Sequence, residues 1–357
     1  GLSYSIMESI QLNTTELNNI LSNFDVNPSN LSYKRIDTGY INDSFYVNKN
    51  GRRKYVLQKL NTNVFRRIDA IKNNINLSID KLDNINYHKI EFLETIGESI
   101  FYNSKQEYWR LMKYVRGSYT KNNAENSKDA YEAGRIISLF HLLLKEEDPK
   151  MYIDTLDNFH NLPYRITEFE YALENSNKNL QQECIEEIIY SKKMFNTLNI
   201  FYNSELPERI CHNDAKLNNI LFSSSNKGLC MIDMDTVMKG YFHYDFGDAV
   251  RTIVNSACEE EEDFSKIIFN KSLFKAFMDG LKSNGKFLSK KELELLPLSA
   301  VLMPFIHGLR ALTDYLNGNI YYKVNYPKQN LVRSRSLFAF SKVALKHKDY
   351  MKEIIGN

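Results

Sequence analysis

The first third of the chain alternates short apolar runs with turn residues, which is the pattern of an antiparallel sheet. Residues 48–51 read Asn-Lys-Asn-Gly between two such runs, and Asn-Gly tolerates the positive φ that a tight hairpin requires. Isoleucines at 71, 75 and 79 are four residues apart, which predicts a helix over 68–83. A short amphipathic helix is expected over 9–24. The alternation predicts strands at 31–36, 44–47, 54–60, 91–96 and 108–115.

Beyond Gly117 the apolar spacing becomes helical, and the chain is expected to be mainly helical from there on. Ser289 followed by Glu292 has the spacing of a capping box. Pro297 is expected to divide this segment from a helix that continues to about Leu316, where Asn-Gly ends it. The other helices and a short hairpin are predicted at 130–145, 183–198 and 274–281, and at 220–222 with 229–232. The pattern therefore predicts an α+β chain, with a small antiparallel sheet first and a larger helical part after it.

Composition excludes several classes of protein but does not identify a function. The chain has 357 residues, enough for two ordinary domains or one bilobal enzyme, and 43% of them are hydrophobic. Its net charge of +2 lacks the basic excess typical of nucleic-acid binders. The mean hydropathy of −0.44 and the absence of a signal-peptide pattern favour a soluble, cytoplasmic protein with no membrane partner. The four cysteines include no C-x-x-C pair, which disfavours zinc fingers and thioredoxin-like redox sites.

Polar residues that suit phosphoryl transfer precede and follow the predicted hairpin. Residues 212–219 read His-Asn-Asp-Ala-Lys-Leu-Asn-Asn, and the second strand ends in Ile-Asp-Met-Asp at 232–235. Phosphoryl transfer needs a carboxylate to accept the proton of the attacking hydroxyl, and oxygen ligands to hold magnesium on the phosphates. Asp214, Asn219 and Asp233 supply these groups. A loop–hairpin–loop layout is expected to bring all three to one end of the same two strands.

These motifs also resemble known families. His-x-Asp-x-Lys-x-x-Asn resembles the catalytic loop of protein kinases. Ile-Asp-x-Asp resembles the magnesium-binding segment of the aminoglycoside phosphotransferase and choline kinase superfamily. Within that superfamily the chain is most similar to the N-acetylhexosamine 1-kinases. The matching stretches occur in the expected order at 39–44, 56–58, 212–219, 232–238, 244–251 and 308–316.

The resemblance implies a bilobal protein-kinase-like fold and a sugar kinase. The N-lobe would span 1–113, the hinge 114–117 and the helical C-lobe 118–357, with ATP between the lobes. The reaction would transfer the γ-phosphate of ATP to the anomeric hydroxyl of N-acetylglucosamine or N-acetylgalactosamine, with Mg²⁺ as cofactor. The partners implied are the small-molecule sugar and ATP, without nucleic acid, and a monomer is favoured.

The same resemblance assigns roles to individual residues. Asp214 would be the base that faces the sugar hydroxyl, and Lys216 would approach the γ-phosphate. Asn219 and Asp233, with help from Asp235, would bind Mg²⁺. The residues expected to contact the nucleotide are Gly39, Asn42, Ser44, Gln58, Met112, Tyr114 and Val115. Those expected to reach the sugar are Arg310, Asp314 and Tyr321, with His160 as a weaker candidate.

Several alternatives stay open at the level of sequence. Gln58 or Lys59 can occupy the place of the protein-kinase β3 lysine, but adjacent strand residues point to opposite faces, and the family pattern slightly favours Gln58. The acceptor can also be an aminoglycoside, choline or homoserine. A nucleotide-binding pseudokinase is least favoured, because the three key polar residues are all present. Asp245, Asp248 and Arg251 are expected to form a hydrogen-bonded network under the catalytic loop.

Overall fold

The N-terminal lobe is built on an antiparallel sheet, as the alternating pattern predicts. The computed structural model describes residues 13–37 and 41–357. The strands follow the order β1-β2-β3-β6-β4, and β5 also pairs with β6. They comprise β1 (Leu31–Ile36), β2 (Asp43–Lys49), β3 (Arg52–Lys59), β4 (Phe92–Leu93), β5 (Tyr102–Ser104) and β6 (Glu107–Lys113). The strand predicted over 91–96 is therefore reduced to the two residues of β4.

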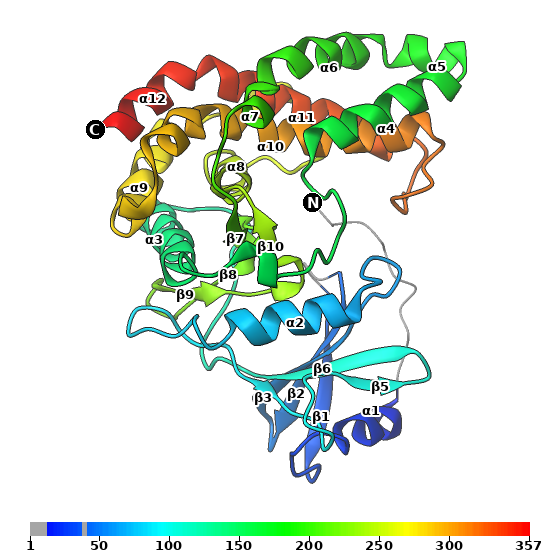
Figure 1. Cartoon of the computed structure of the whole chain (residues 1–357). Coiled ribbons are helices and arrows are strands. Elements are labelled where there is room, and N and C mark those ends of the chain that lie inside the picture. Colours follow the sequence, from blue (N-terminus) through cyan, green and yellow to red (C-terminus); the bar gives the residue numbers. More distant parts are fainter. Residues whose placement is uncertain (1–12, 38–40) are drawn as a thin grey trace.

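Two helices flank this sheet. α1 (Thr14–Leu21) buries Leu17 and Leu21 with Leu57 and Trp109 against one face of it. α2 (Ile68–Ser78) lies between the sheet and the second lobe (Figure 1) and is shorter than the helix predicted over 68–83. The Asn74 side chain of α2 donates hydrogen bonds to the carbonyls of Ile153, at 2.7 Å, and Val237, at 2.8 Å. This helix therefore ties the two lobes together.

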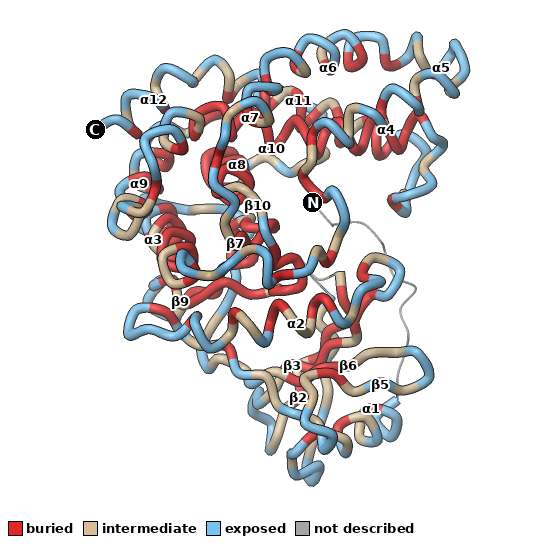
Figure 2. Tube along the Cα trace, in the orientation of Figure 1, coloured by how far each residue is buried: buried red, intermediate tan, exposed pale blue. Residues whose placement is uncertain are grey.

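The C-terminal lobe is mainly helical, and two small strand pairs face the N-terminal lobe (Figure 1). β7 (Arg209–Cys211) pairs with β10 (Met238–Gly240), and β8 (Ile220–Phe222) pairs with β9 (Gly228–Met231). Buried residues run along α8 and α10 (Figure 2). The helices are α3 (Ser127–Leu143), α4 (Leu162–Asn175), α5 (Lys178–Glu183), α6 (Ile185–Leu198), α7 (Ile200–Asn203), α8 (Phe242–Ile253), α9 (Lys271–Lys282), α10 (Lys290–Leu316), α11 (Gln329–Lys346) and α12 (Lys348–Gly356).

The central helix α10 corrects one prediction. Pro297 does not divide the segment, and the helix runs through both Pro297 and Pro304. Each proline removes one backbone hydrogen bond, but every residue from Leu296 to Leu316 is buried, and this packing outweighs the loss. The helix is apolar enough to cross a membrane by composition, yet 94% of its most apolar 18-residue window is buried inside the protein, as expected of a core helix. The predicted Ser289–Glu292 capping box is confirmed.

Helices α3 and α9 approach so closely that glycine is required where they cross. A Cβ atom at Gly280 would lie 1.9 Å from the carbonyl oxygen of Tyr131. We expect Gly280→Ala to lower the free energy of unfolding by about 2–3 kcal/mol, because two helix backbones would have to separate. Urea unfolding followed by circular dichroism measures this. Gly356→Ala is the matched control, since a Cβ there meets no atom within 4 Å, and equal stability of the two variants would contradict the prediction.

Candidate active site

The loop that carries Asp214 is fixed from below by a buried carboxylate of α8. Asp245 Oδ2 accepts a hydrogen bond from the backbone N–H of His212, at 2.9 Å, and Oδ1 accepts one from that of Asn213, at 2.8 Å. His141 Nε2 lies 2.6 Å from the same Oδ2. Asn213 takes a left-handed conformation with φ of 67°, which changes the direction of the chain immediately before Asp214. The loop is therefore held rigidly by groups that do not themselves line the pocket above it.

The predicted network under the loop is in fact two separate clusters. Asp245 serves the catalytic loop, whereas Asp248 pairs with Arg251 at 2.9 Å and with His307 at 2.8 Å. Arg251 also pairs with Glu259, at 2.6 Å. This second cluster joins α8 to α10 and to the loop after α8.

His212 is a structural residue. Its Nδ1 accepts from the backbone N–H of Asp214, at 3.2 Å, and its Nε2 donates to the carbonyl of Ile232, at 2.7 Å. Both ring nitrogens are thus used within the protein, so the ring joins the catalytic loop to the end of β9. This leaves Asp214 as the base candidate of the loop.

The structure brings Asp214 and Asn219 into direct contact. Asn219 Nδ2 donates to the backbone carbonyl of Asp214, at 2.7 Å, and to its Oδ2, at 3.2 Å. Within the described part of the chain Oδ1 of Asp214 makes no hydrogen bond, so it remains able to accept a proton. A narrow cavity of about 20 Å³ gathers most of the predicted catalytic and metal residues. Its lining includes Asn42, Asp214, Lys216, Asn219, Asp233 and Asp235.

Asp233 has the properties of a cation ligand. It follows β9 in a left-handed conformation with φ of 60°, and its carboxylate makes no hydrogen bond or ion pair with any described residue. Desolvation raises the pKa of Asp233 to about 7, and the negative charge of Asp235 acts in the same direction while Arg110 opposes it. A divalent cation bound beside Asp233 would offset the cost of burying its charged carboxylate. The amide oxygen of Asn219 and the carboxylate of Asp233 are oxygen donors of the kind that Mg²⁺ prefers.

Asp235 differs from Asp233, because its carboxylate is already paired. Arg110 of β6 donates from Nη1 to Oδ1, at 2.5 Å, and from Nη2 to Oδ2, at 2.9 Å. Asn42 Nδ2 also donates to Oδ2, at 2.9 Å. Arg110 was not anticipated from the sequence. The signal that could have found it is the strand register, because Arg110 lies directly opposite Gln58 of β3.

The orientation of β3 distinguishes Gln58 from Lys59. Gln58 faces the cleft, where its Oε1 accepts from Arg110 Nε, at 2.9 Å, and its Nε2 donates to Ser44 Oγ, at 3.1 Å. Lys59 lies on the opposite face and pairs with Glu107, at 3.0 Å. Only Gln58 is therefore oriented toward the space between the lobes.

A second cavity, of about 70 Å³, lies beside the end of β6. Met112, Tyr114 and Val115, which were expected to contact the nucleotide, line it, and it reaches Gln58, Arg110 and Asp233 at its polar end. The backbone carbonyl of Val115 already accepts from the N–H and the hydroxyl of Ser118, at 3.1 and 2.6 Å. Gly39, also predicted to contact the nucleotide, lies outside the described residues. The other lining residues are mainly apolar or aromatic, including Tyr46, Val56, Ile90, Phe92, Tyr119, Leu221, Ile232 and Met234.

The residues expected on the sugar side divide into two kinds. The Asp314 carboxylate accepts from the backbone N–H groups of Tyr321, at 2.7 Å, and Tyr322, at 3.0 Å, so it anchors the loop after α10. The Arg310 side chain is buried over the rings of Phe159 and Tyr321, each at 5.5 Å. Its Nη1 has no hydrogen-bond partner among the described residues.

His160 joins this region to the catalytic loop. Its Nε2 lies 2.7 Å from the carbonyl oxygen of Asn213, the neighbour of Asp214. Burial lowers the pKa of His160 to about 4, and Asp248 acts in the opposite direction. The ring is therefore neutral at physiological pH and donates to the Asn213 carbonyl. Phe159, the chain neighbour of His160, packs against the Arg310 guanidinium, so Arg310 lies next to the segment that contacts the Asn213 carbonyl.

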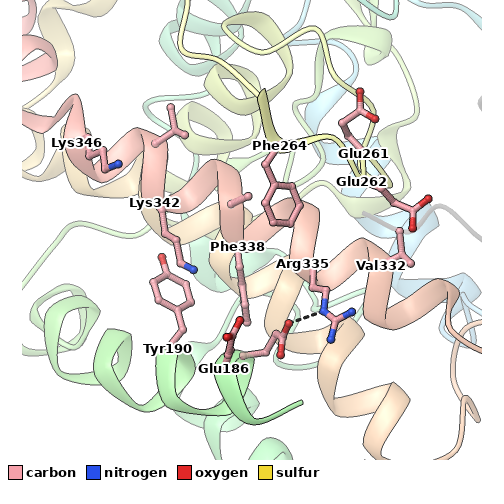
Figure 3. A pocket seen from close by; sticks show the side chains of 13 residues that line it. Glu186, Tyr190, Glu261, Glu262, Phe264, Val332, Arg335, Phe338, Lys342 and Lys346 are labelled. Atoms are coloured by element: carbon pink, nitrogen blue, oxygen red, sulfur yellow. Dashed lines mark hydrogen bonds and ion pairs between the residues drawn. The ribbon is translucent and has the colours of Figure 1, made fainter. Parts of the chain in front are cut away.

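A larger hollow, of about 530 Å³, lies between α6, α11 and the loop before residue 264 (Figure 3). None of the predicted site residues lines it. Its floor carries an ion pair of Arg335 with Glu187, at 2.6 Å, and the Lys342 ammonium lies 4.7 Å from the centre of the Tyr190 ring. The hollow is thus separate from the residues that have phosphoryl-transfer chemistry.

Comparisons with known proteins agree with this architecture. A solved aminopropanol kinase associated with a microcompartment superposes with a TM-score of 0.66 at 14% identity, covering 95% of this chain and 99% of its own. An ethanolamine kinase from Plasmodium vivax gives 0.60 at 13%, covering 92% and 91%. A choline kinase from Cryptosporidium parvum gives 0.58 at 14%, covering 95% and 97%. At these identities the likeness establishes the bilobal kinase-like fold.

The sequence itself carries the family signal. Residues 32–264, well over half of the chain, match the model of the phosphotransferase enzyme family, APH. The matched region contains the sheet, the catalytic loop and the Asp233–Asp235 segment. The chain belongs to the phosphotransferase enzyme family.

Proposed function

We propose that the protein is an ATP- and magnesium-dependent kinase that phosphorylates the anomeric hydroxyl of an N-acetylhexosamine. The observation that carries the proposal is the cavity in which Asp214, Asn219 and Asp233 meet. A free carboxylate oxygen, an amide oxygen and an unpaired carboxylate are the groups that phosphoryl transfer to an alcohol requires. Their meeting also argues against a nucleotide-binding pseudokinase.

The proposed reaction consists of a proton transfer and a phosphoryl transfer, and the side chains of the protein position the reacting groups. Asp214 accepts the proton of the sugar hydroxyl, while Asn219 holds its other oxygen in place. Lys216 lines the same cavity and supplies positive charge toward the transferred phosphoryl group. Asn219 and Asp233 would hold Mg²⁺, which when bound neutralises charge on the phosphates. Asp245 keeps the loop rigid, so Asp214 needs no rearrangement.

The acceptor side favours a neutral substrate over a cation. Arg310 places a guanidinium cation in a buried position on α10. It has no carboxylate partner within 4.0 Å among the described residues. Asp314, one turn along α10, uses its carboxylate oxygens to accept from the backbone N–H groups of Tyr321 and Tyr322 and from the Asn330 amide. An unpaired cation repels an aminoglycoside or choline but donates readily to sugar hydroxyl or acetamide oxygens.

A second candidate is an amino-alcohol kinase. It is favoured by the fold shared with kinases described as acting on aminopropanol, ethanolamine and choline. A panel of N-acetylglucosamine, N-acetylgalactosamine, ethanolamine, choline, homoserine and kanamycin separates the two. We expect ADP release only with the N-acetylhexosamines, and a phosphorus NMR signal coupled to the anomeric proton. Turnover of ethanolamine or choline without turnover of the sugars would replace the first candidate by the second. Turnover of kanamycin alone would indicate an aminoglycoside kinase instead.

Replacing Arg310 tests the acceptor site directly. We expect Arg310→Leu to raise KM for the N-acetylhexosamine at least tenfold, because the guanidinium hydrogen bonds are lost, and to leave KM for ATP nearly unchanged. Steady-state kinetics with each substrate varied in turn provides the measurement. Lys342→Leu, in the hollow of Figure 3, is the matched control. A rise in KM for ATP alone would assign Arg310 to the nucleotide instead.

A further inference from the structure

Arg110 is a buried cation in the N-terminal lobe with hydrogen-bonding capacity left over. Its side chain is 3% exposed. The guanidinium has five N–H donors, and the hydrogen bonds to Gln58 and Asp235 use three of them. Two donors, one on each terminal nitrogen, remain available. They belong to a group that lines the polar end of the cavity beside β6.

Positive charge is scarce around the two cavities between the lobes. Arg110 is the only lysine or arginine among the described residues that line the cavity beside β6. Lys216 is the only one among the described residues that line the cavity at the catalytic loop. The triphosphate of ATP is a polyanion, and its binding needs fixed cations as well as a metal. β3 supplies none to either lining, because Gln58 faces the cleft and Lys59 faces away. The other cations of this strand, at positions 52–54, line neither cavity.

Asp235 is held by two residues of the opposite lobe. Both of its oxygens accept from Arg110, and Oδ2 also accepts from Asn42, whose Oδ1 accepts from the backbone N–H of Asn61, at 2.8 Å. Asp235 is 4% exposed, so this ion pair is shielded from water. A bidentate guanidinium–carboxylate pair fixes both distance and orientation. It thus fixes the 233–236 segment against the sheet.

The geometry points to a different role for each of Arg110, Asp235 and Gln58. Arg110 is the phosphate-binding cation of the N-terminal lobe, in place of a lysine on β3, and Asp235 is its lobe-bridging counterion instead of a ligand to the metal. Gln58 is a positioning residue that orients the guanidinium through its Nε. This inference rests on phosphoryl transfer from a nucleotide, as proposed above, and is independent of which alcohol accepts the group.

Binding of ADP without divalent metal tests the first half of the inference. In excess EDTA only fixed protein cations can attract the phosphates. We expect Arg110→Gln to weaken ADP binding, measured by calorimetry, at least tenfold, and Arg110→Lys to weaken it less because the charge is kept. Arg335→Gln is the control, since its guanidinium also pairs with a carboxylate, that of Glu187 at 2.6 Å, and lies outside both cavity linings. Unchanged metal-free affinity in Arg110→Gln would overturn the phosphate role.

Binding of Mn²⁺ to the free enzyme, followed by electron paramagnetic resonance, tests the second half. A counterion role predicts that Asp235→Asn keeps Mn²⁺ affinity within about threefold of the parent, whereas Asp233→Asn loses at least tenfold. Equal losses in the two variants would make Asp235 a metal ligand. Neither measurement involves the acceptor, so an absence of sugar kinase activity would refute the proposed function without affecting these results.

A double variant separates the loss of phosphate binding from misfolding caused by an unpaired buried charge. Removing one member of a buried ion pair leaves an uncompensated charge, but replacing both members by apolar residues is often tolerated. We expect Arg110→Met combined with Asp235→Leu to fold, to retain Mn²⁺ binding, and still to lose at least tenfold in metal-free ADP affinity. Retained ADP affinity in this folded variant would contradict the inference.

Discussion

Replacing Asp214 by asparagine is expected to lower kcat about 10³-fold, the usual scale for removing a general base. The amide keeps the size of the side chain and the contact with Asn219 Nδ2, which is 3.2 Å from Oδ2 in the native protein. It has no basic oxygen that can take the proton of the attacking hydroxyl. ADP affinity is expected to change less than threefold, because Asp214 does not line the cavity beside β6 that we propose for the nucleotide.

The assay follows ADP release with the sugar, and calorimetry measures ADP binding separately. Asp279→Asn is the matched control, because its carboxylate is an exposed partner of Lys275 on α9 and the chemical change is identical. Turnover within tenfold of the parent would remove Asp214 from the role of base. A comparable fall in the Asp279 variant would show that the loss is a general effect of charge.

The catalytic cluster could be anticipated because its geometry is local. Asp214 and Asn219 are five residues apart on one loop, and the β8–β9 hairpin returns the chain so that Asp233 lies at the same end. The hairpin was predicted with its first strand at the observed residues, 220–222. Short sequence separation and a two-strand register were therefore enough to bring these groups together.

Arg110 and its partner could not be found in this way. Their ion pair joins residues 125 positions apart in different lobes, and no local pattern encodes how the lobes are set against one another. Within β6 Arg110 lies between apolar residues that pack on the sheet, where an arginine reads as an ordinary exposed strand position. Asp235 was predicted to help Asp233 bind Mg²⁺, but the structure pairs its carboxylate with Arg110, although the two acids are only two residues apart.

Helix boundaries in the C-terminal lobe depended on tertiary packing as well. Pro297 is a strong local signal for a break, yet α10 continues because every residue from 296 to 316 is buried, in contact with helices such as α8 and α11. α8 was not predicted as a helix at all, since its segment reads as a string of motif residues, 244–251. Its polar side chains are buried because Asp245 and Asp248 hold backbone and arginine groups there. The same residues form the helix and carry the motif. Their polar side chains interrupt the apolar spacing by which a helix is recognised in a sequence.

Asp233→Asn is expected to lower turnover at saturating sugar and ATP at least 100-fold and to raise the magnesium concentration needed for half-maximal rate at least tenfold. A neutral amide gives up the charge that attracts the cation, and the neighbouring Asp235 cannot replace it while Arg110 and Asn42 occupy its oxygens. Excess chelator should abolish the activity of the parent as well, because the phosphates would lose their neutralising ion.

Magnesium titration of the rate, with Asp279→Asn as control, checks the Asp233 prediction. The design separates ligation from collapse of the site, since a variant that merely unfolds loses ADP binding in EDTA, whereas loss of a metal ligand leaves that binding in place. A normal magnesium requirement in Asp233→Asn would mean that another carboxylate of the cavity holds the ion. Asp214 would then be the first alternative, because it is the nearest acid whose carboxylate is not already paired with a cation.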